Sequence, residues 1–119
     1  MPAHPPRDAR DPLESITTRH ILSALRSRGG RWIKMHGHSR QDATLDIIGC
    51  YRGCYVEIEV KRTGKKATPR QALIIAFVRE VEGFACVAYD AEDAHALLDE
   101  IDDFIENERA AHDRRHGAV

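Results

Sequence analysis

Charged side chains near the middle of the sequence have the types and spacing of a hydrolytic site. Residues 54–61 read Cys-Tyr-Val-Glu-Ile-Glu-Val-Lys, with an apolar residue at every second position. Alternate residues of a strand point to opposite faces, so Glu57, Glu59 and Lys61 share the face opposite the apolar one. Because Glu and Lys are poor strand formers, this row needs another explanation. With Asp46 upstream, it predicts a site for a divalent cation and a phosphodiester.

The turn that precedes this strand decides whether Asp46 can reach the charged row. A two-residue turn at Arg52-Gly53, with glycine at a positive φ, places Asp46 opposite Glu59 on the same face. A four-residue loop places Asp46 opposite Glu57 and keeps the same face, whereas a three-residue loop needs a bulge to do so. Two of the three simple registers therefore gather the acidic groups.

Two carboxylates this close repel each other unless a cation lies between them. Mg²⁺ or Mn²⁺ is the expected cofactor, since hard cations take carboxylate, carbonyl and water oxygens, and the main-chain carbonyl of Val60 is a further candidate ligand. Lys61 can orient or deprotonate a water, or neutralise charge on the transferring phosphorus. Asp46, Glu59 and Lys61 are thus predicted to form a metal-dependent hydrolytic site without an organic cofactor. The alternative is an exposed strand face with charge pairs.

The elements that must position these residues follow the order α-β-β-β-α-β-α. A hairpin followed by a crossover helix and another strand implies an α/β fold, with a mixed sheet flanked by helices. A chain of 119 residues is expected to form one domain, spanning 11–109, between flexible tails at 1–10 and 110–119. The predicted strands cover 31–35, 43–50, 54–61 and 84–89, and the predicted helices start at Asp11, Thr68 and Asp90.

The composition is that of a globular protein, with 42% hydrophobic and 31% charged residues and a net charge of −1. Binding to nucleic acid would therefore rely on a local basic patch. Three cysteines, an odd number, and no signal-like apolar segment favour the reducing cytoplasm. The longest apolar stretch, 72–78, is too short to span a bilayer, so no membrane association is expected.

The pattern resembles the PD-(D/E)XK nuclease superfamily and, within it, the VRR-NUC family of small viral and bacterial nucleases. The resemblance covers about residues 14–98. It rests on Asp46-Ile-Ile, on Glu59-Val-Lys61, on a Gly-Lys loop and on Gln71. It implies a restriction-endonuclease-like αβββαβ core with an extra C-terminal helix. The sequence departs from the family pattern at Leu45, where proline is common, and lacks the usual glycine just upstream.

The same resemblance assigns roles to individual residues. It places the metal-binding acids on Asp46 and Glu59, the lysine on Lys61, the helix glutamine on Gln71 and the first-helix acid on Glu14. A capping box would explain Gln71 and Glu14 equally well. Gln71 lies three residues after the predicted N-cap Thr68, and Glu14 lies three residues after the predicted N-cap Asp11. Glu57 is expected to be an outer neighbour of the site.

Basic and histidine residues close to the predicted site are candidates for contacts with DNA phosphates. They could equally be solvated loop residues, although a helix N-terminus nearby favours phosphate binding. These candidates are Lys65, Lys66, Arg70, His36 and His38. A zinc site built from the two histidines with Cys50 and Cys54 is a weaker alternative, because Cys54 falls on the core face.

The resemblance therefore implies a Mg²⁺- or Mn²⁺-dependent DNA endonuclease in a bacterial or phage-infected cell. Similar minimal proteins act on branched DNA such as Holliday junctions, and a two-fold homodimer would supply two symmetric cuts. The alternatives are a restriction-like or mismatch-type nuclease on linear duplex, and an inactive module of the same fold that binds nucleic acid or protein.

Overall fold

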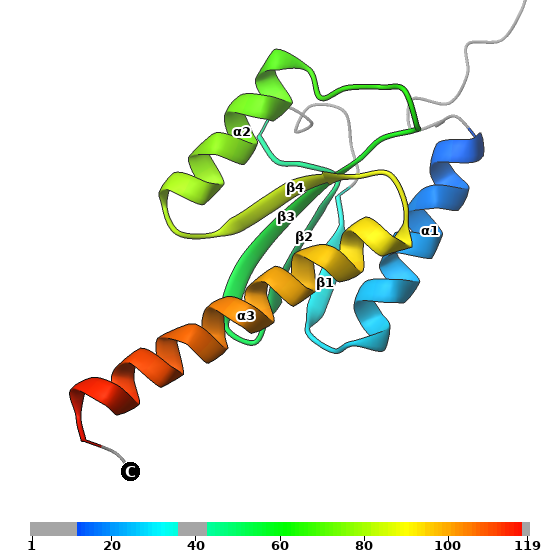
Figure 1. The fold of residues 1–119 in the computed structure, drawn as a ribbon. Coiled ribbons are helices and arrows are strands. Elements are labelled where there is room, and N and C mark those ends of the chain that lie inside the picture. The colour runs from blue at the N-terminus through cyan, green and yellow to red at the C-terminus, as the bar shows by residue number, and fades with distance from the viewer. Residues whose placement is uncertain (1–11, 36–42, 118–119) are drawn as a thin grey trace, which may run out of the picture.

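The computed structural model describes residues 12–35 and 43–117 and confirms the predicted order of elements (Figure 1). Within these residues, no helix is long and apolar enough to cross a membrane. The elements in chain order are α1 (Pro12–Ser27), β1 (Arg31–Lys34), β2 (Ile47–Tyr51), β3 (Cys54–Val60), α2 (Pro69–Glu80), β4 (Phe84–Ala88) and α3 (Ala91–Arg115).

The four strands form one mixed sheet in the order β1-β2-β3-β4. The first three strands are antiparallel to their neighbours, and β4 runs parallel to β3 after the crossover through α2. In Figure 1, α1 and α3 lie on one side of the sheet and α2 lies on the other. This is the predicted α/β arrangement of a mixed sheet flanked by helices.

Alternation along β3 separates the core from the charged face, as the sequence predicts. Val56, Ile58 and Val60 are fully buried in the main core, beneath α1 and α3. The residues between them face α2, where a smaller apolar cluster is centred on Leu45 and Val78. Because helices cover both faces, carboxylates on the α2 face are removed from water.

The hairpin between β2 and β3 has the predicted two-residue turn. Tyr51 pairs with Cys54, and the turn residues Arg52 and Gly53 have φ angles of 51° and 85°. Two positive φ values are typical of the type I′ turn, whose twist matches that of antiparallel strands. This turn sets the register that carries Asp46 to Glu59.

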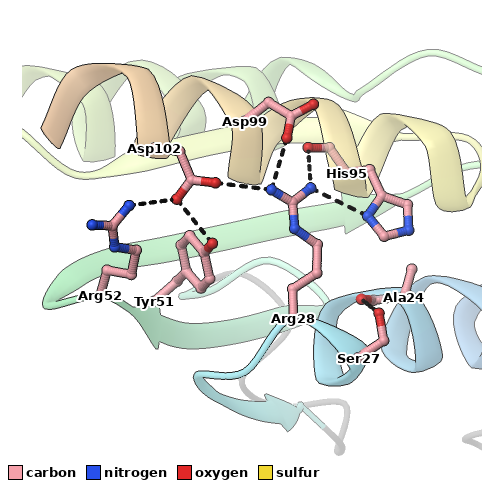
Figure 2. Close-up of polar contacts among 8 residues, drawn as sticks. All are labelled: Ala24, Ser27, Arg28, Tyr51, Arg52, His95, Asp99 and Asp102. Atoms are coloured by element: carbon pink, nitrogen blue, oxygen red, sulfur yellow. Dashed lines mark hydrogen bonds and ion pairs between the residues drawn. The ribbon is translucent and has the colours of Figure 1, made fainter. Parts of the chain in front are cut away.

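A polar network joins the hairpin to both helices on the opposite side of the sheet from α2 (Figure 2). Arg28, just after α1, donates to Asp99 and Asp102 of α3 at 2.7 and 2.9 Å. Arg52 and the Tyr51 hydroxyl donate to the other oxygen of Asp102 at 2.8 and 2.9 Å. The bond from Arg52 is the main cause of the lowered pKa of Asp102. The network therefore ties the hairpin to α3 most firmly above the usual pKa of an aspartate.

The largest differences from the predicted boundaries lie at the start of β2 and at the end of α3. β2 begins at Ile47 rather than at residue 43, since the Leu45 N–H donates to a side chain instead of to a strand. α3 continues to Arg115, so the expectation of a frayed segment from residue 110 is wrong for 110–115. Alanines at 110 and 111 favour helix, and basic residues in the last turn suit its dipole. The end of α3 extends beyond the sheet in Figure 1.

Candidate active site

The predicted site residues meet where β2 starts, β3 ends and α2 begins. Ile47 pairs with Ile58, so the register brings Asp46, just before β2, beside Glu59. Lys61 directly follows β3, and Gln71 lies in the first turn of α2. Elements from three parts of the chain thus place Asp46, Glu59, Lys61 and Gln71 at one edge of the sheet.

The Asp46 carboxylate is held by the end of β3. The Val60 N–H donates to Asp46 Oδ2 at 2.9 Å. In a strand, the N–H and C=O of one residue point to the same side, so the Val60 carbonyl also points toward the side of Asp46. One carboxylate and one main-chain carbonyl therefore face the same space, as the predicted ligand set requires.

Glu59 is the most perturbed carboxyl group of this site. It is only 5% exposed, and Gln71 Nε2 donates to its Oε2 at 2.8 Å. Lys61 Nζ lies 3.8 Å from the same oxygen. Burial and the adjacent Asp46 carboxylate raise the pKa of Glu59 to about 8, and Lys61 offsets this only in part. A carboxyl group with this pKa keeps its proton at neutral pH unless a positive charge is added, so a bound cation would favour the ionised form of Glu59.

Gln71 has contacts that fit both of the roles that the sequence left open. Its side-chain oxygen accepts the Thr68 N–H at 2.9 Å, and its own N–H donates to the Thr68 hydroxyl at 3.2 Å. This is a capping box at the start of α2. The amide nitrogen of the same side chain is then directed at Glu59, so the cap orients the group that holds the carboxylate.

Glu57 positions the segment before Asp46, a role that the sequence analysis did not assign. It is 5% exposed, and both of its oxygens are used. The Leu45 N–H donates to Oε1 at 2.9 Å and the Tyr55 hydroxyl to Oε2 at 2.7 Å. These contacts fit its expected place as an outer neighbour of the predicted site. The charged face was visible in the sequence, but a bond to a main-chain N–H twelve residues away was not.

The basic candidates lie around the start of α2. Lys65, Lys66 and Arg70 are all exposed. The loop that carries the two lysines is anchored, because the Tyr89 hydroxyl donates to the Lys65 carbonyl at 2.8 Å. Exposed cations at a helix N-terminus next to the carboxylates suit a polyanionic ligand.

Three other candidates stay predictions. Glu14 lies in the first turn of α1 and is half-buried, and its part in the site is untested. His36 and His38 lie outside the described residues.

The donor set fits a hard divalent cation better than zinc. Cys50 pairs with Tyr55, and Cys54 pairs with Tyr51, so the two thiols point to opposite faces of the hairpin. In residues 12–35 and 43–117, no three His, Cys, Asp or Glu side chains gather in a group that could hold a metal ion, so protein side chains would supply at most two ligands of these types. Two adjacent carboxylates and a main-chain carbonyl leave room for water, which Mg²⁺ and Mn²⁺ usually retain.

Among solved structures, one described as a VRR_NUC domain matches this chain with a TM-score of 0.61. The two share 18% sequence identity, and the match covers 73% of this chain and 95% of the other. No protein-family model matches the sequence, and no curated protein does. The match shows that this chain shares its fold with a structure described as a VRR_NUC domain, and it confirms the predicted α/β fold of a mixed sheet flanked by helices.

Proposed function

We propose that this chain, which has the fold of a VRR-NUC domain, is a Mg²⁺- or Mn²⁺-dependent endonuclease that hydrolyses phosphodiester bonds in DNA. The observation that carries the proposal is the buried Glu59 carboxyl beside Asp46, where burial and the Asp46 carboxylate together raise the pKa of Glu59 to about 8. Ionising both carboxyl groups here is costly unless a positive ligand binds between them, and such perturbed pairs are typical of functional sites. Exposed lysines beside the pair supply the attraction for a phosphate backbone.

Asp46, Glu59 and the Val60 carbonyl would hold the cation. When bound, Mg²⁺ or Mn²⁺ supplies charge neutralisation at the attacked phosphate and lowers the pKa of a water. Lys61 Nζ, 3.8 Å from Glu59, can donate to a phosphate oxygen or orient the attacking water. Gln71 keeps the Glu59 carboxylate in place through its 2.8 Å bond. Water adds to phosphorus as the bond from phosphorus to the leaving oxygen breaks.

DNA would lie along the start of α2. Lys65, Lys66 and Arg70 are exposed there and would contact phosphates. Contacts to phosphates do not depend on the base sequence, so the chain would select DNA by its shape. We therefore propose branched DNA, such as a four-way junction, as the substrate, cut by a homodimer whose two sites are related by a two-fold axis.

Cleavage of a four-way junction and of a linear duplex with the same arms tests this function. We expect cutting with Mg²⁺ or Mn²⁺, none in EDTA, and a rate at least about tenfold higher on the junction, because the shape-dependent contacts form only there. Equal rates on both DNAs would replace the branched substrate with linear duplex. Binding of either DNA by the wild type without any cutting would contradict the enzyme and favour an inactive binding module.

A further inference from the structure

One flank of α2 exposes large apolar side chains. Leu73, Phe77 and Val81 are 70%, 64% and 61% exposed, more than any other large hydrophobic residue in the described part of the chain. They recur every four residues, so they form a single stripe along the helix. A contiguous exposed apolar stripe usually marks an interaction surface.

The stripe faces the half of the sheet away from β4. Arg79, at the other flank of α2, reaches round the edge strand β4, where its Nε donates to the Ala85 carbonyl at 2.9 Å and its guanidinium pairs with Glu100 at 3.0 Å. Successive helical residues are about 100° apart, so Phe77 points about 200° away from Arg79. Phe77 and its neighbours in the stripe therefore look over β3 toward β2 and β1.

The sheet beneath this flank is also apolar and open to solvent. α2 packs on β3 and β4, whereas Ile33 of β1 is 41% exposed and Tyr55 of β3 is 46% exposed. Ile33 follows the core residue Trp32, so alternation places it on the α2 face. Tyr55 shares that face, since its hydroxyl bonds Glu57. The stripe and these two residues form one surface, which we call the α2 flank.

The α2 flank is complementary to itself. In an antiparallel pair of α2 helices with Phe77 on the two-fold axis, Leu73 of one copy faces Val81 of the other. Basic residues gather at the start of α2, at Lys66 and Arg70, and acidic residues at its end, at Glu80 and Glu82. Within one chain, basic residues at the start of a helix and acidic residues at its end both interact unfavourably with the helix dipole. The antiparallel pair sets each basic start beside the acidic end of the other copy.

The area is sufficient for a specific but moderate interface. The exposed parts of five large side chains in each copy amount to about 1,000 Å² over two copies, near the lower bound for a specific interface. We propose that two copies of this chain associate through the α2 flank, with their α2 helices antiparallel and Phe77 at the axis. The inference deepens the proposed function, because it assigns the surface that forms the homodimer.

The same pairing would set the spacing of the two active sites. Gln71 lies six residues before Phe77, which is about 9 Å along a helix. Two copies of Gln71 would then be about 20 Å apart along the helix axes, on opposite sides of the two-fold axis. That separation suits cuts in two different strands of one DNA.

The mass of the protein in solution tests this interface. We expect light scattering after size exclusion to show a dimer for the wild type at about 100 μM, and Phe77→Glu to weaken the dimer at least tenfold, since it buries a charge at the axis. Leu13→Glu is the matched control, because Leu13 is 56% exposed but lies on α1. It should leave the dimer unchanged.

A charge exchange gives an independent arm of the same test. Arg70→Glu and Glu80→Arg should each weaken the dimer, and the double variant should restore it, because the contact is between opposite ends of α2. A monomeric wild type at 100 μM, or equal effects of Phe77→Glu and Leu13→Glu, would overturn the interface. A monomer that cuts DNA would remove the interface and keep the nuclease, whereas a dimer that binds no cation and cuts nothing would do the reverse.

Discussion

Asp46→Asn is expected to slow DNA cleavage by about 10²–10⁴-fold at saturating Mg²⁺, because it removes one negative ligand from the proposed cation site. Asparagine has nearly the same shape, and its side-chain oxygen can still accept the Val60 N–H that Asp46 accepts at 2.9 Å. The fold should therefore be unchanged. Single-turnover cleavage of a four-way junction measures the effect directly.

The control for this variant is Asp103→Asn, which removes the same charge from an exposed position on α3. It should cleave at the wild-type rate. DNA binding by Asp46→Asn in EDTA should also match the wild type, since the contacts to phosphate come from the start of α2. Cleavage by Asp46→Asn within about threefold of the wild type would remove Asp46 from the reaction.

Glu59→Gln is expected to abolish cleavage and yet to stabilise the metal-free protein at alkaline pH. The folded-state pKa of Glu59 is raised to about 8 from an ordinary value of 4.5, so the wild type loses stability as pH rises between these values. Glutamine cannot ionise. Its advantage in the free energy of unfolding should be absent below pH 4.5 and reach roughly 1–3 kcal/mol above pH 8. Urea unfolding in EDTA at pH 5 and at pH 8.5 measures the difference in unfolding free energy between the variant and the wild type near each of these limits.

Two further measurements separate this effect from a general change in charge. Glu108→Gln alters an exposed carboxylate near the end of α3 and should change the unfolding free energy equally at both pH values. Saturating Mg²⁺ should reduce the difference in unfolding free energy between Glu59→Gln and the wild type at pH 8.5. A cation that binds only the folded wild type stabilises it. If Glu59→Gln and the wild type differ in unfolding free energy by the same amount at pH 5 and at pH 8.5, the raised pKa of Glu59 would be contradicted.

Much of this arrangement could be predicted because it depends on local rules. Strict alternation separates the core residues of β3 from its charged row, and Arg52-Gly53 has the chemistry of a two-residue turn. Together they determine the register that joins Asp46 to Glu59. Thr68 with Gln71 likewise has the spacing of a capping box, which the structure confirms.

The rest depends on contacts between distant parts of the chain. The bond from the Leu45 N–H to Glu57 delays the start of β2 to Ile47 and holds the residue before Asp46, and no local pattern encodes it. Nor does spacing within α2 reveal that Gln71 uses its oxygen for the cap and its nitrogen for Glu59. The exposure of Leu73 and Phe77 also depends on which strands α2 covers, and the sequence of the helix does not show that.

The most direct test of the proposed site is anomalous scattering from crystals of the protein grown with Mn²⁺. The account predicts one strong Mn²⁺ peak within about 2.0–2.4 Å of carboxylate oxygens of Asp46 and Glu59, with the Val60 carbonyl as a further ligand and water completing the shell. Asp46→Asn crystals should show a weak peak or none. A wild-type map with no peak at this position under saturating Mn²⁺, or with the ion bound only elsewhere, would contradict the account.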